Sequence, residues 1–188
     1  KSGVQMGKLR DCSTLPEMKR AGEIPNRNLS IRRARSEDIP VVEKLIPRSG
    51  RELQSEYYSA AQMEAAIGSV FGVDRQLIRD ETYFVVESEN TIAGCGGWSK
   101  RKSLFGGDQW GGRSAALLDP ETDAAKIRAF FVHLDWARRG VGSLILATCE
   151  RAALAEGFRR FEMRAPLTGV PLYRACRSEE AEKLLVSL

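Results

Sequence analysis

One stretch of the chain, residues 130–157, constrains the fold more than any other because three structural signals follow one another without a gap. Residues 126–133 are strongly apolar, as in a buried β-strand. Gly140 and Gly142 then form a short turn, and residues 141–155 carry apolar side chains at helical spacing. Gly157 follows, where a helix often ends in a left-handed glycine. A strand, a turn and a helix in this order predict an α/β fold.

A glycine turn that opens a helix is also typical of phosphate binding. The first N–H groups of a helix have no intrahelical partner, and the positive end of its dipole points the same way. Gly140 and Gly142 would let the backbone approach a pyrophosphate, and Arg138 and Arg139 bring positive charge to its rim. A tight turn without a ligand is the alternative for an isolated pattern of this kind. The third glycine of a dinucleotide fingerprint and the Gly-Lys-Ser/Thr of a triphosphate loop are missing, which disfavours nicotinamide and ATP sites.

The residues before this stretch predict short elements. Residues 31–34 have the pattern of a strand, and Ser36, followed by two acids, starts a helix that we expect to end at Pro47. A second helix is predicted to begin at Ser59, and a third covers residues 75–79.

A hairpin and a long connection precede the apolar strand. Residues 82–86 and 91–98 predict two strands that flank a turn at Glu89. The three glycines between positions 94 and 97 indicate a bulge or a close backbone approach. Residues 99–125 predict a long loop of the kind that often faces a substrate.

The two ends of the chain have no clear place in this pattern. Residues 1–29 mix Gly, Pro, Asn, Ser and charged side chains without an apolar period, so we expect a flexible leader before one domain of residues 30–188. Residues 1–30 hold six basic and three acidic side chains, which is +3 of the formal net charge of +4. Residues 159–164 alternate as a strand, whereas residues 172–188 have a helical pattern.

Composition narrows the class of protein. With 43% hydrophobic and 29% charged residues, the chain resembles globular domains. Residues 31–188 carry only +1 of the formal net charge of +4, which disfavours nucleic-acid binding. No apolar run is long enough to span a bilayer. The four cysteines are scattered and there is one His, so we expect no metal site, and free thiols in a reducing cytoplasm.

The glycine turn resembles the acetyl-CoA motif of a known family. Residues 137–142, Ala-Arg-Arg-Gly-Val-Gly, are similar to the pyrophosphate motif of the GNAT superfamily of N-acetyltransferases, with Ala137 in a slot that the family fills with Gln or Arg. The likeness extends over residues 31–176. It implies a mixed, mostly antiparallel sheet flanked by helices, with acetyl-CoA as cosubstrate.

The same resemblance assigns roles to residues of this chain. The backbones of Phe131 and Val132 would bind the pantetheine arm as an added strand does, and this strand would polarise the thioester carbonyl. A plain buried strand is the other interpretation, and both can hold. The turn and the start of the helix would hold the pyrophosphate through Arg138, Arg139, Gly140, Val141, Gly142 and Ser143.

Tyr173 is the candidate general acid. It lies in residues 169–176, which resemble the segment where the family often places a Tyr next to the CoA sulfur, and its hydroxyl would protonate the departing thiolate. A Tyr that anchors a helix in the core is the alternative. The general base stays open among water and three carboxylates, Glu81, Glu87 and Asp108.

Other side chains are weaker candidates. His133, the single His, is expected to be structural because it ends the apolar strand just before the turn. Trp98, Trp110 and Tyr57 or Tyr58 could line an acceptor pocket, although each is as compatible with packing in the core or a loop.

The resemblance ends after Cys176. The family continues into a final pair of strands, whereas residues 178–188 predict a charged helix with Ala181, Leu184 and Leu185 inward. A missing pair would leave the strand at residues 159–164 at an edge of the sheet. Reduced stability, a homodimer over that edge and a truncated product are three alternatives.

These patterns together favour an N-acetyltransferase that moves acetyl from acetyl-CoA to a primary amine. A small-molecule amine is the preferred acceptor, and a protein N-terminus or lysine is second. Two rivals stay open: a non-catalytic acyl-CoA-binding or regulatory module, which a missing strand pair would explain, and a phosphate or nucleotide site without CoA.

Overall fold

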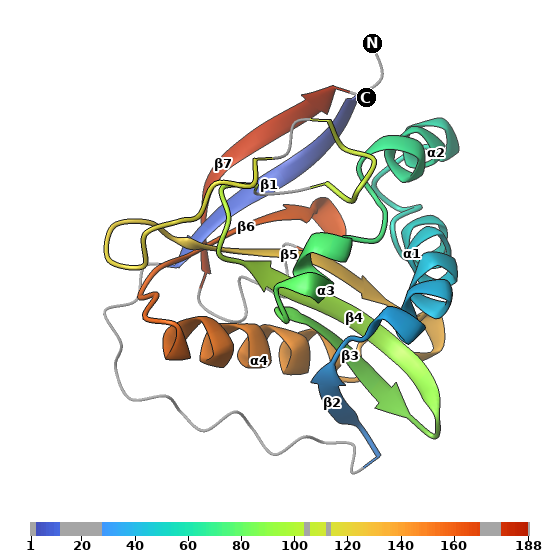
Figure 1. The fold of residues 1–188 in the computed structure, drawn as a ribbon. Coiled ribbons are helices and arrows are strands. Elements are labelled where there is room, and N and C mark those ends of the chain that lie inside the picture. Colours follow the sequence, from blue (N-terminus) through green and yellow to red (C-terminus); the bar gives the residue numbers. More distant parts are fainter. Residues whose placement is uncertain (1–2, 12–27, 104–105, 112–113, 170–177, 188) are drawn as a thin grey trace.

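The computed structural model describes residues 3–11, 28–103, 106–111, 114–169 and 178–187, which form one mixed sheet with helices on both faces (Figure 1). The sheet has seven strands in the order β2-β3-β4-β5-β6-β1-β7. Only β5 and β6 pair in parallel; the other described pairs are antiparallel. The predicted α/β class is therefore confirmed. The strands are β1 (Gly3–Asp11), β2 (Ser30–Arg33), β3 (Tyr83–Ser88), β4 (Thr91–Ser99), β5 (Ala125–Val132), β6 (Phe161–Pro166) and β7 (Ser178–Ser187).

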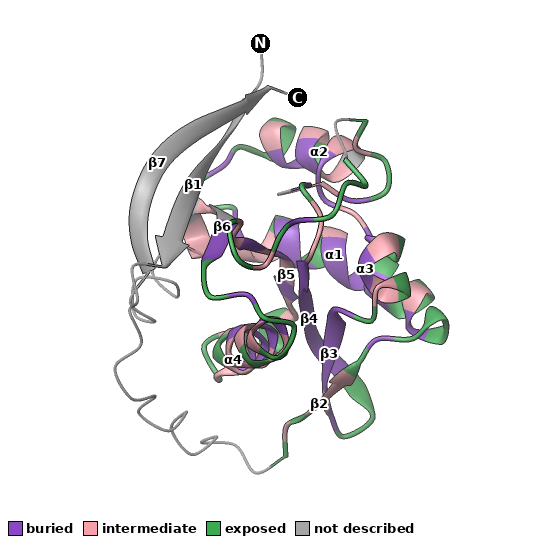
Figure 2. Ribbon diagram, turned by 60° about the vertical axis from the view of Figure 1, so that its left-hand side comes forward, coloured by how far each residue is buried: buried purple, intermediate pink, exposed green. Residues whose placement is uncertain are grey.

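The helices divide between the two faces of the sheet, each over its own apolar core. Tyr83 and Phe131 are buried in one core, with residues of α1 (Ile39–Leu53), α2 (Ala60–Ser69) and α3 (Arg75–Arg79). Trp98 and Ile127 are buried in the other, against α4 (Val141–Ala155). Figure 2 shows the buried residues of β3, β4 and β5 between these two layers. The described residues also include three short 3₁₀ helices, η1 (Ser36–Asp38), η2 (Leu134–Trp136) and η3 (Leu167–Gly169).

Helix α1 is longer than predicted. Pro47 cannot donate a hydrogen bond to the carbonyl four residues earlier, so we expected the helix to end there. The helix instead continues to Leu53, because Ile46, Ser49 and Gly50 around the proline are buried. A Cβ on Gly50 would lie 3.1 Å from the sulfur of Met63 in α2. Close packing of this kind outweighs a local cost of about 3 kcal/mol.

The prediction of a flexible leader is wrong for residues 3–11, which form β1. This strand lies between β6 and β7 and pairs with both. The glycines and charged residues of this segment give no strand pattern. The strand forms because its hydrogen-bonding partners, β6 and β7, come from the other end of the chain. The rest of that leader, residues 12–27, lies outside the described residues.

The predicted C-terminal helix is also wrong, because Ser178–Ser187 is a strand. Ala, Glu, Lys and Leu rank among the best helix formers, but such preferences amount to less than about 1 kcal/mol per residue, and a ladder of backbone hydrogen bonds to β1 overrides them. The sheet is thus closed by a strand pair after all, with one strand from each end of the chain (Figure 1). Strand β6 is paired with β5 on one side and with β1 on the other, so it has no free edge over which a homodimer could form as predicted.

Strands β5 and β6 separate along their length and form a fork. Their pairing covers only residues 125–127 of β5 against residues 161–163 of β6. Beyond those pairs β5 continues to Val132 and β6 to Pro166. The separation leaves room for a cavity between the two strands.

Two findings concern the whole described part of the chain. None of its helices is long and apolar enough to cross a membrane. Cys95 and Cys149 are buried free thiols, as expected, whereas Cys12 and Cys176 lie outside the described residues.

Candidate active site

A cavity of about 610 Å³ opens in the fork between β5 and β6. One side is formed by the second half of β5, residues 128–132, and the other by Pro166, Thr168 and Gly169 at the end of β6. The start of α4 lines one part of the cavity, and residues at the end of α1 and between α2 and α3 line another. A single space therefore connects the predicted phosphate turn with a pocket beside the end of α1.

The start of α4 has the geometry of an anion site. Gly140 is the N-cap residue with a left-handed φ of 86°, and as a glycine it has no side chain to cap the helix. A Cβ on Gly140 would meet no described atom within 4 Å, so the backbone is open on that side. Of the residues predicted to bind pyrophosphate, five line the cavity: Arg138, Gly140, Val141, Gly142 and Ser143.

Arg139 is the predicted pyrophosphate residue that the described lining does not include. Its guanidinium lies over the ring of Trp136, 5.4 Å from the ring centroid. Trp136 itself lines the cavity. Arg139 therefore acts on the cavity wall through a cation–π contact.

His133 has a local structural contact, as expected. Its Nδ1 accepts a hydrogen bond from the backbone N–H of Asp135 at 3.3 Å, which caps η2. This contact helps to set the path of the chain from β5 into the glycine turn.

The backbone of β5 faces the fork at alternate residues. The N–H of His133 donates to Ala93 of β4 at 2.9 Å. Alternate residues of a strand direct their N–H groups to opposite edges, so Phe131 also faces β4, whereas Phe130 and Val132 face the fork. The N–H of Val132 donates to the hydroxyl oxygen of Ser49 in α1 at 3.1 Å. Phe131 and Val132, which were predicted to bind the pantetheine arm, both line the cavity, but of these two only Val132 directs its N–H toward the fork.

A bulge interrupts β5 at the point where it leaves β6. Cys95 lies opposite Phe131 and Gly97 opposite Arg128, so two residues of β5, Ala129 and Phe130, face the single residue between them on β4. Ala129 has a φ of 60°, in the left-handed region that is strained for residues with a side chain. The bulge agrees with the expectation from the glycines of β4.

Arg128, the residue before the bulge, carries a buried charge into the cavity wall. Its guanidinium pairs with the carboxylate of Asp74 at the start of α3, and both side chains are at most 2% exposed. It also donates to the carbonyls of Ser103 at 2.8 Å and Gly106 at 2.6 Å. Burial lowers the pKa of Arg128 to about 10, which still leaves it protonated at neutral pH beside Asp74. This pair holds the long loop against β5.

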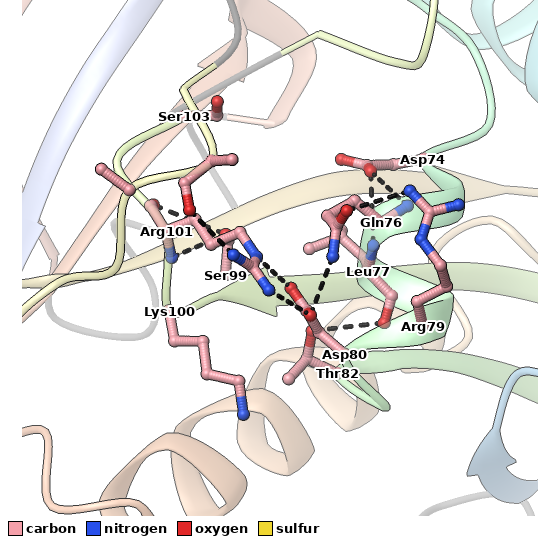
Figure 3. Close-up of polar contacts among 12 residues, drawn as sticks. Asp74, Gln76, Leu77, Arg79, Asp80, Thr82, Ser99, Lys100, Arg101 and Ser103 are labelled. Carbon is pink, nitrogen blue, oxygen red and sulfur yellow. Dashed lines mark hydrogen bonds and ion pairs between the residues drawn. The ribbon is translucent and has the colours of Figure 1, made fainter.

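A second ion pair holds the same loop against α3. Arg101 donates two hydrogen bonds to the carboxylate of Asp80, at 2.7 and 2.8 Å (Figure 3). Arg101 also forms an isolated bridge with Leu117. Asp80 follows α3, so the loop is fixed at both ends of that helix.

The part of the cavity beside the end of α1 is mostly apolar. Leu53, Tyr57, Val70 and Phe71 line it, and Glu56 is the one carboxylate among the described lining residues. Gln54 also lines it and is 5% exposed; its Oε1 has no hydrogen-bond partner among the described residues. Of this group, only Tyr57 was predicted from sequence as a residue that could line an acceptor pocket.

The other aromatic candidates lie elsewhere. Tyr58 and Trp98 are buried in the two cores, and the Trp98 ring packs edge-on against Phe158. Trp110 is partly buried against the first core.

The three predicted base candidates lie outside the described lining, each in an ion pair. Glu81 pairs with Arg33 at 2.7 Å, Glu87 with Arg32 at 2.6 Å, and Asp108 with Arg75 at 2.9 Å. Tyr173 lies outside the described residues. No cluster of three His, Cys, Asp or Glu side chains in the described ranges could hold a metal ion.

Solved structures share this fold at low sequence identity. A GCN5-related N-acetyltransferase from Ralstonia eutropha JMP134 has a TM-score of 0.57 and 15% identity over 85% of this chain and 98% of that one. The PaiA N-acetyltransferase from Thermoplasma acidophilum, in complex with coenzyme A, has a TM-score of 0.52 and 12% identity over 79% and 87%. AAC(6')-Iy, in complex with the bisubstrate analog CoA-S-monomethyl-acetylneamine, has a TM-score of 0.53 and 14% identity over 85% and 97%.

The sequence comparisons give the family directly. Comparison with curated protein sequences finds no match. The model of the acetyltransferase (GNAT) family matches residues 48–176, which is more than half of the chain. This segment contains the fork, the glycine turn and α4. The chain therefore belongs to the GNAT acetyltransferase family.

Proposed function

We propose that this acetyltransferase moves acetyl from acetyl-CoA to the primary amine of a small molecule. The observation that carries the proposal is the continuity of the cavity, which runs from the open start of α4, along the fork, to the apolar pocket beside α1. A cosubstrate that enters from the helix start and an acceptor that enters from the pocket would meet at β5. Proximity of this kind supplies a large part of the catalysis of bimolecular reactions.

The residues of the fork fit acetyl-CoA. The open N–H groups at the start of α4 suit the pyrophosphate, and Arg138 adds a positive charge. The carbonyl of Phe130 and the N–H of Val132 suit the amide-bearing pantetheine arm, which would pair with them as an added strand does. The Val132 N–H, which donates to Ser49, would have to be released or shared for such pairing.

The chemistry is direct transfer. The amine nitrogen forms a bond to the acetyl carbon and gives up one proton, while the carbon–sulfur bond breaks and its electron pair stays on sulfur. The sulfur takes up one proton to become the free thiol. A backbone N–H of the bulge would stabilise the charge on the carbonyl oxygen, and Tyr173 is our candidate for the proton donor to sulfur.

The acceptor pocket favours a compact amine with an apolar body. Leu53, Tyr57 and Phe71 offer apolar and aromatic surface, and Glu56 offers one negative charge to an ammonium group. A polycationic acceptor would need several carboxylates. Glu56 is also a candidate for the general base, in place of the three carboxylates proposed from sequence.

Two measurements test this function. Calorimetry should show that acetyl-CoA binds, with ATP and NAD much weaker. A thiol-release assay should then show turnover with an aromatic or aliphatic monoamine, and less turnover with a polyamine or with a peptide that has a free N-terminus. Comparable binding of ATP would favour a nucleotide site, and binding without turnover would favour the non-catalytic module. The non-catalytic module was suggested by a missing C-terminal strand pair. Because β1 and β7 form such a pair, this reason no longer applies.

A further inference from the structure

A tyrosine hydroxyl on β3 reaches across a whole strand to the bulge of β5. The Tyr83 hydroxyl donates to the carbonyl oxygen of Ala129 at 3.2 Å. Tyr83 lies opposite Gly97 of β4, and Gly97 lies opposite Arg128 of β5. The side chain of Tyr83 is therefore the link between the bulge and a strand that does not pair with β5.

Two adjacent glycines of β4 make room for the aromatic rings that hold the bulge. A Cβ on Gly97 would lie 2.8 Å from the Tyr83 ring and 2.6 Å from the Thr82 carbonyl. A Cβ on Gly96 would lie 2.4 Å from the ring of Phe130. The ring of Tyr83 and the ring of Phe130 thus occupy, on opposite faces of the sheet, the space that side chains on β4 would fill.

The hydroxyl fixes the direction of one peptide group. In a trans peptide the carbonyl and the following N–H point in opposite directions. The Ala129 carbonyl points to Tyr83, so the N–H of Phe130 in the same peptide points away from it. Strand alternation, counted back from the His133 N–H on Ala93, independently directs the Phe130 N–H to the fork. Both arguments direct this N–H toward the cavity that Phe130 lines.

This peptide needs an external restraint. Ala129 holds a left-handed φ of 60°, a conformation that costs about 1 kcal/mol or more in a residue with a side chain. Tyr83 is fully buried, and burial raises the pKa of its hydroxyl well above the ordinary value. The hydroxyl therefore keeps its proton and remains a donor over the whole working range of pH.

We propose that Tyr83 is a positioning residue for acetyl transfer: its hydroxyl holds the Ala129–Phe130 peptide so that the Phe130 N–H donates to the acetyl carbonyl oxygen. The inference rests on the proposed function, because it assigns a reacting group to the cavity. Tyr83 does not touch the reacting atoms and acts only through Ala129. Gly97 is part of the same device, because a side chain there would displace the tyrosine ring.

The first test is Tyr83→Phe, which keeps the ring and removes the hydroxyl. We expect kcat to fall about 10-fold to 100-fold, somewhat less than the loss of a whole oxyanion donor, while the Kd for acetyl-CoA stays within about two-fold. Tyr58→Phe is the matched control, because Tyr58 is a buried tyrosine of the same core that does not line the cavity. An unchanged kcat in Tyr83→Phe, or an equal loss in Tyr58→Phe, would overturn the proposal.

The second test needs no mutation and can overturn the proposal even if Tyr83→Phe folds poorly, because the proposal requires the Phe130 N–H to donate to the acetyl oxygen. The ¹⁵N and ¹H shifts of the Phe130 amide are compared in the wild-type protein with acetyl-CoA and with S-ethyl-CoA, which lacks the carbonyl oxygen. We expect a downfield shift of the amide proton with acetyl-CoA alone. Equal shifts with both ligands would overturn the assignment of this N–H, although acetyl-CoA binding and turnover would still support the proposed function. Absence of acetyl-CoA binding would instead overturn the proposed function itself.

Discussion

The hydroxyl oxygen of Ser49 in α1 accepts a hydrogen bond from the N–H of Val132 in β5, at 3.1 Å, and so occupies one of the backbone groups that face the fork. Ser49→Ala should lower the free energy of unfolding by about 1 kcal/mol, because one buried hydrogen bond is lost. The same change should leave acetyl-CoA affinity equal or improve it a few-fold, because the ligand no longer has to displace the hydroxyl. Calorimetry checks the affinity and thermal unfolding the stability. Ser69→Ala, in a helix serine outside the cavity lining, is the control, and a large loss of affinity in Ser49→Ala alone would contradict the prediction.

Gly142→Asp should reduce acetyl-CoA affinity about 100-fold or more. Gly142 lines the cavity at the start of α4, so a carboxylate there would repel the pyrophosphate and compete for its N–H groups. Gly142→Asn has nearly the same size without the charge and should lose much less. Equal affinities of the two variants in calorimetry would mean that the pyrophosphate binds elsewhere.

Asp80→Asn should destabilise the fold at neutral pH but not in acid. Hydrogen bonds from Arg101 hold the pKa of Asp80 below its ordinary value of 3.8. The stabilisation is therefore complete above pH 3.8 and is lost as the pH falls through the lower folded-state value. Urea unfolding at neutral and acid pH should show a difference from the parent that shrinks in acid. Glu89→Gln, at an exposed turn, should leave the free energy of unfolding unchanged at both pH values. If Asp80→Asn remains equally destabilised in acid, the charge of Asp80 is not the source of the stabilisation.

Arg10→Pro should destabilise the protein strongly. Arg10 of β1 lies between Glu162 of β6 and Glu179 of β7, so its N–H faces a neighbouring strand. A proline removes that donor, which costs about 3 kcal/mol and lowers Tm by roughly 6–12 °C in a chain of this size. Arg10→Ala keeps the N–H and is the control. Equal melting temperatures of the two variants would show that β1 adds little to the sheet.

Tyr173→Phe should lower kcat and leave acetyl-CoA affinity within a few-fold, because the ring is kept and only the proton donor is lost. General acid catalysis contributes about 100-fold or more, and a thiolate is a tolerable leaving group, so we expect a loss at the low end. The kcat is measured with several amines. If kcat stays unchanged with all of them, solvent protonates the thiolate. If thermal unfolding loses its cooperativity, the hydroxyl anchors the fold.

The core of the candidate site could be predicted from sequence because its signals are local. The apolar strand, the turn at Gly140 and the helix after it lie within one continuous stretch, and each follows from propensities of adjacent residues. Gly140 does adopt the left-handed conformation that only glycine adopts without strain.

The parts that were missed depend on partners distant in sequence. Strand β1 and strand β7 form because each supplies hydrogen-bonding partners to the other, and neither segment has a strong strand pattern alone. Phe130 and Val132, rather than Phe131, direct their N–H groups to the fork because N–H groups alternate between the two edges of a strand, and the sequence alone does not say which alternate set faces β4. Tyr83 looked like an ordinary strand residue, since nothing local indicates that its hydroxyl crosses β4.

The position of β1 in the sheet also determines when the protein can finish folding. Met6 pairs with Pro166 on one side and with Leu184 on the other. At about 5–20 residues per second, a ribosome needs roughly 8–30 seconds to proceed from Met6 to Pro166. During that time β1 exposes two unpaired edges beside a growing chain, a state that favours aggregation. Slow translation of β6 and β7 would prolong this exposure, so the yield of folded protein in a cell should depend on how quickly these two strands are synthesised.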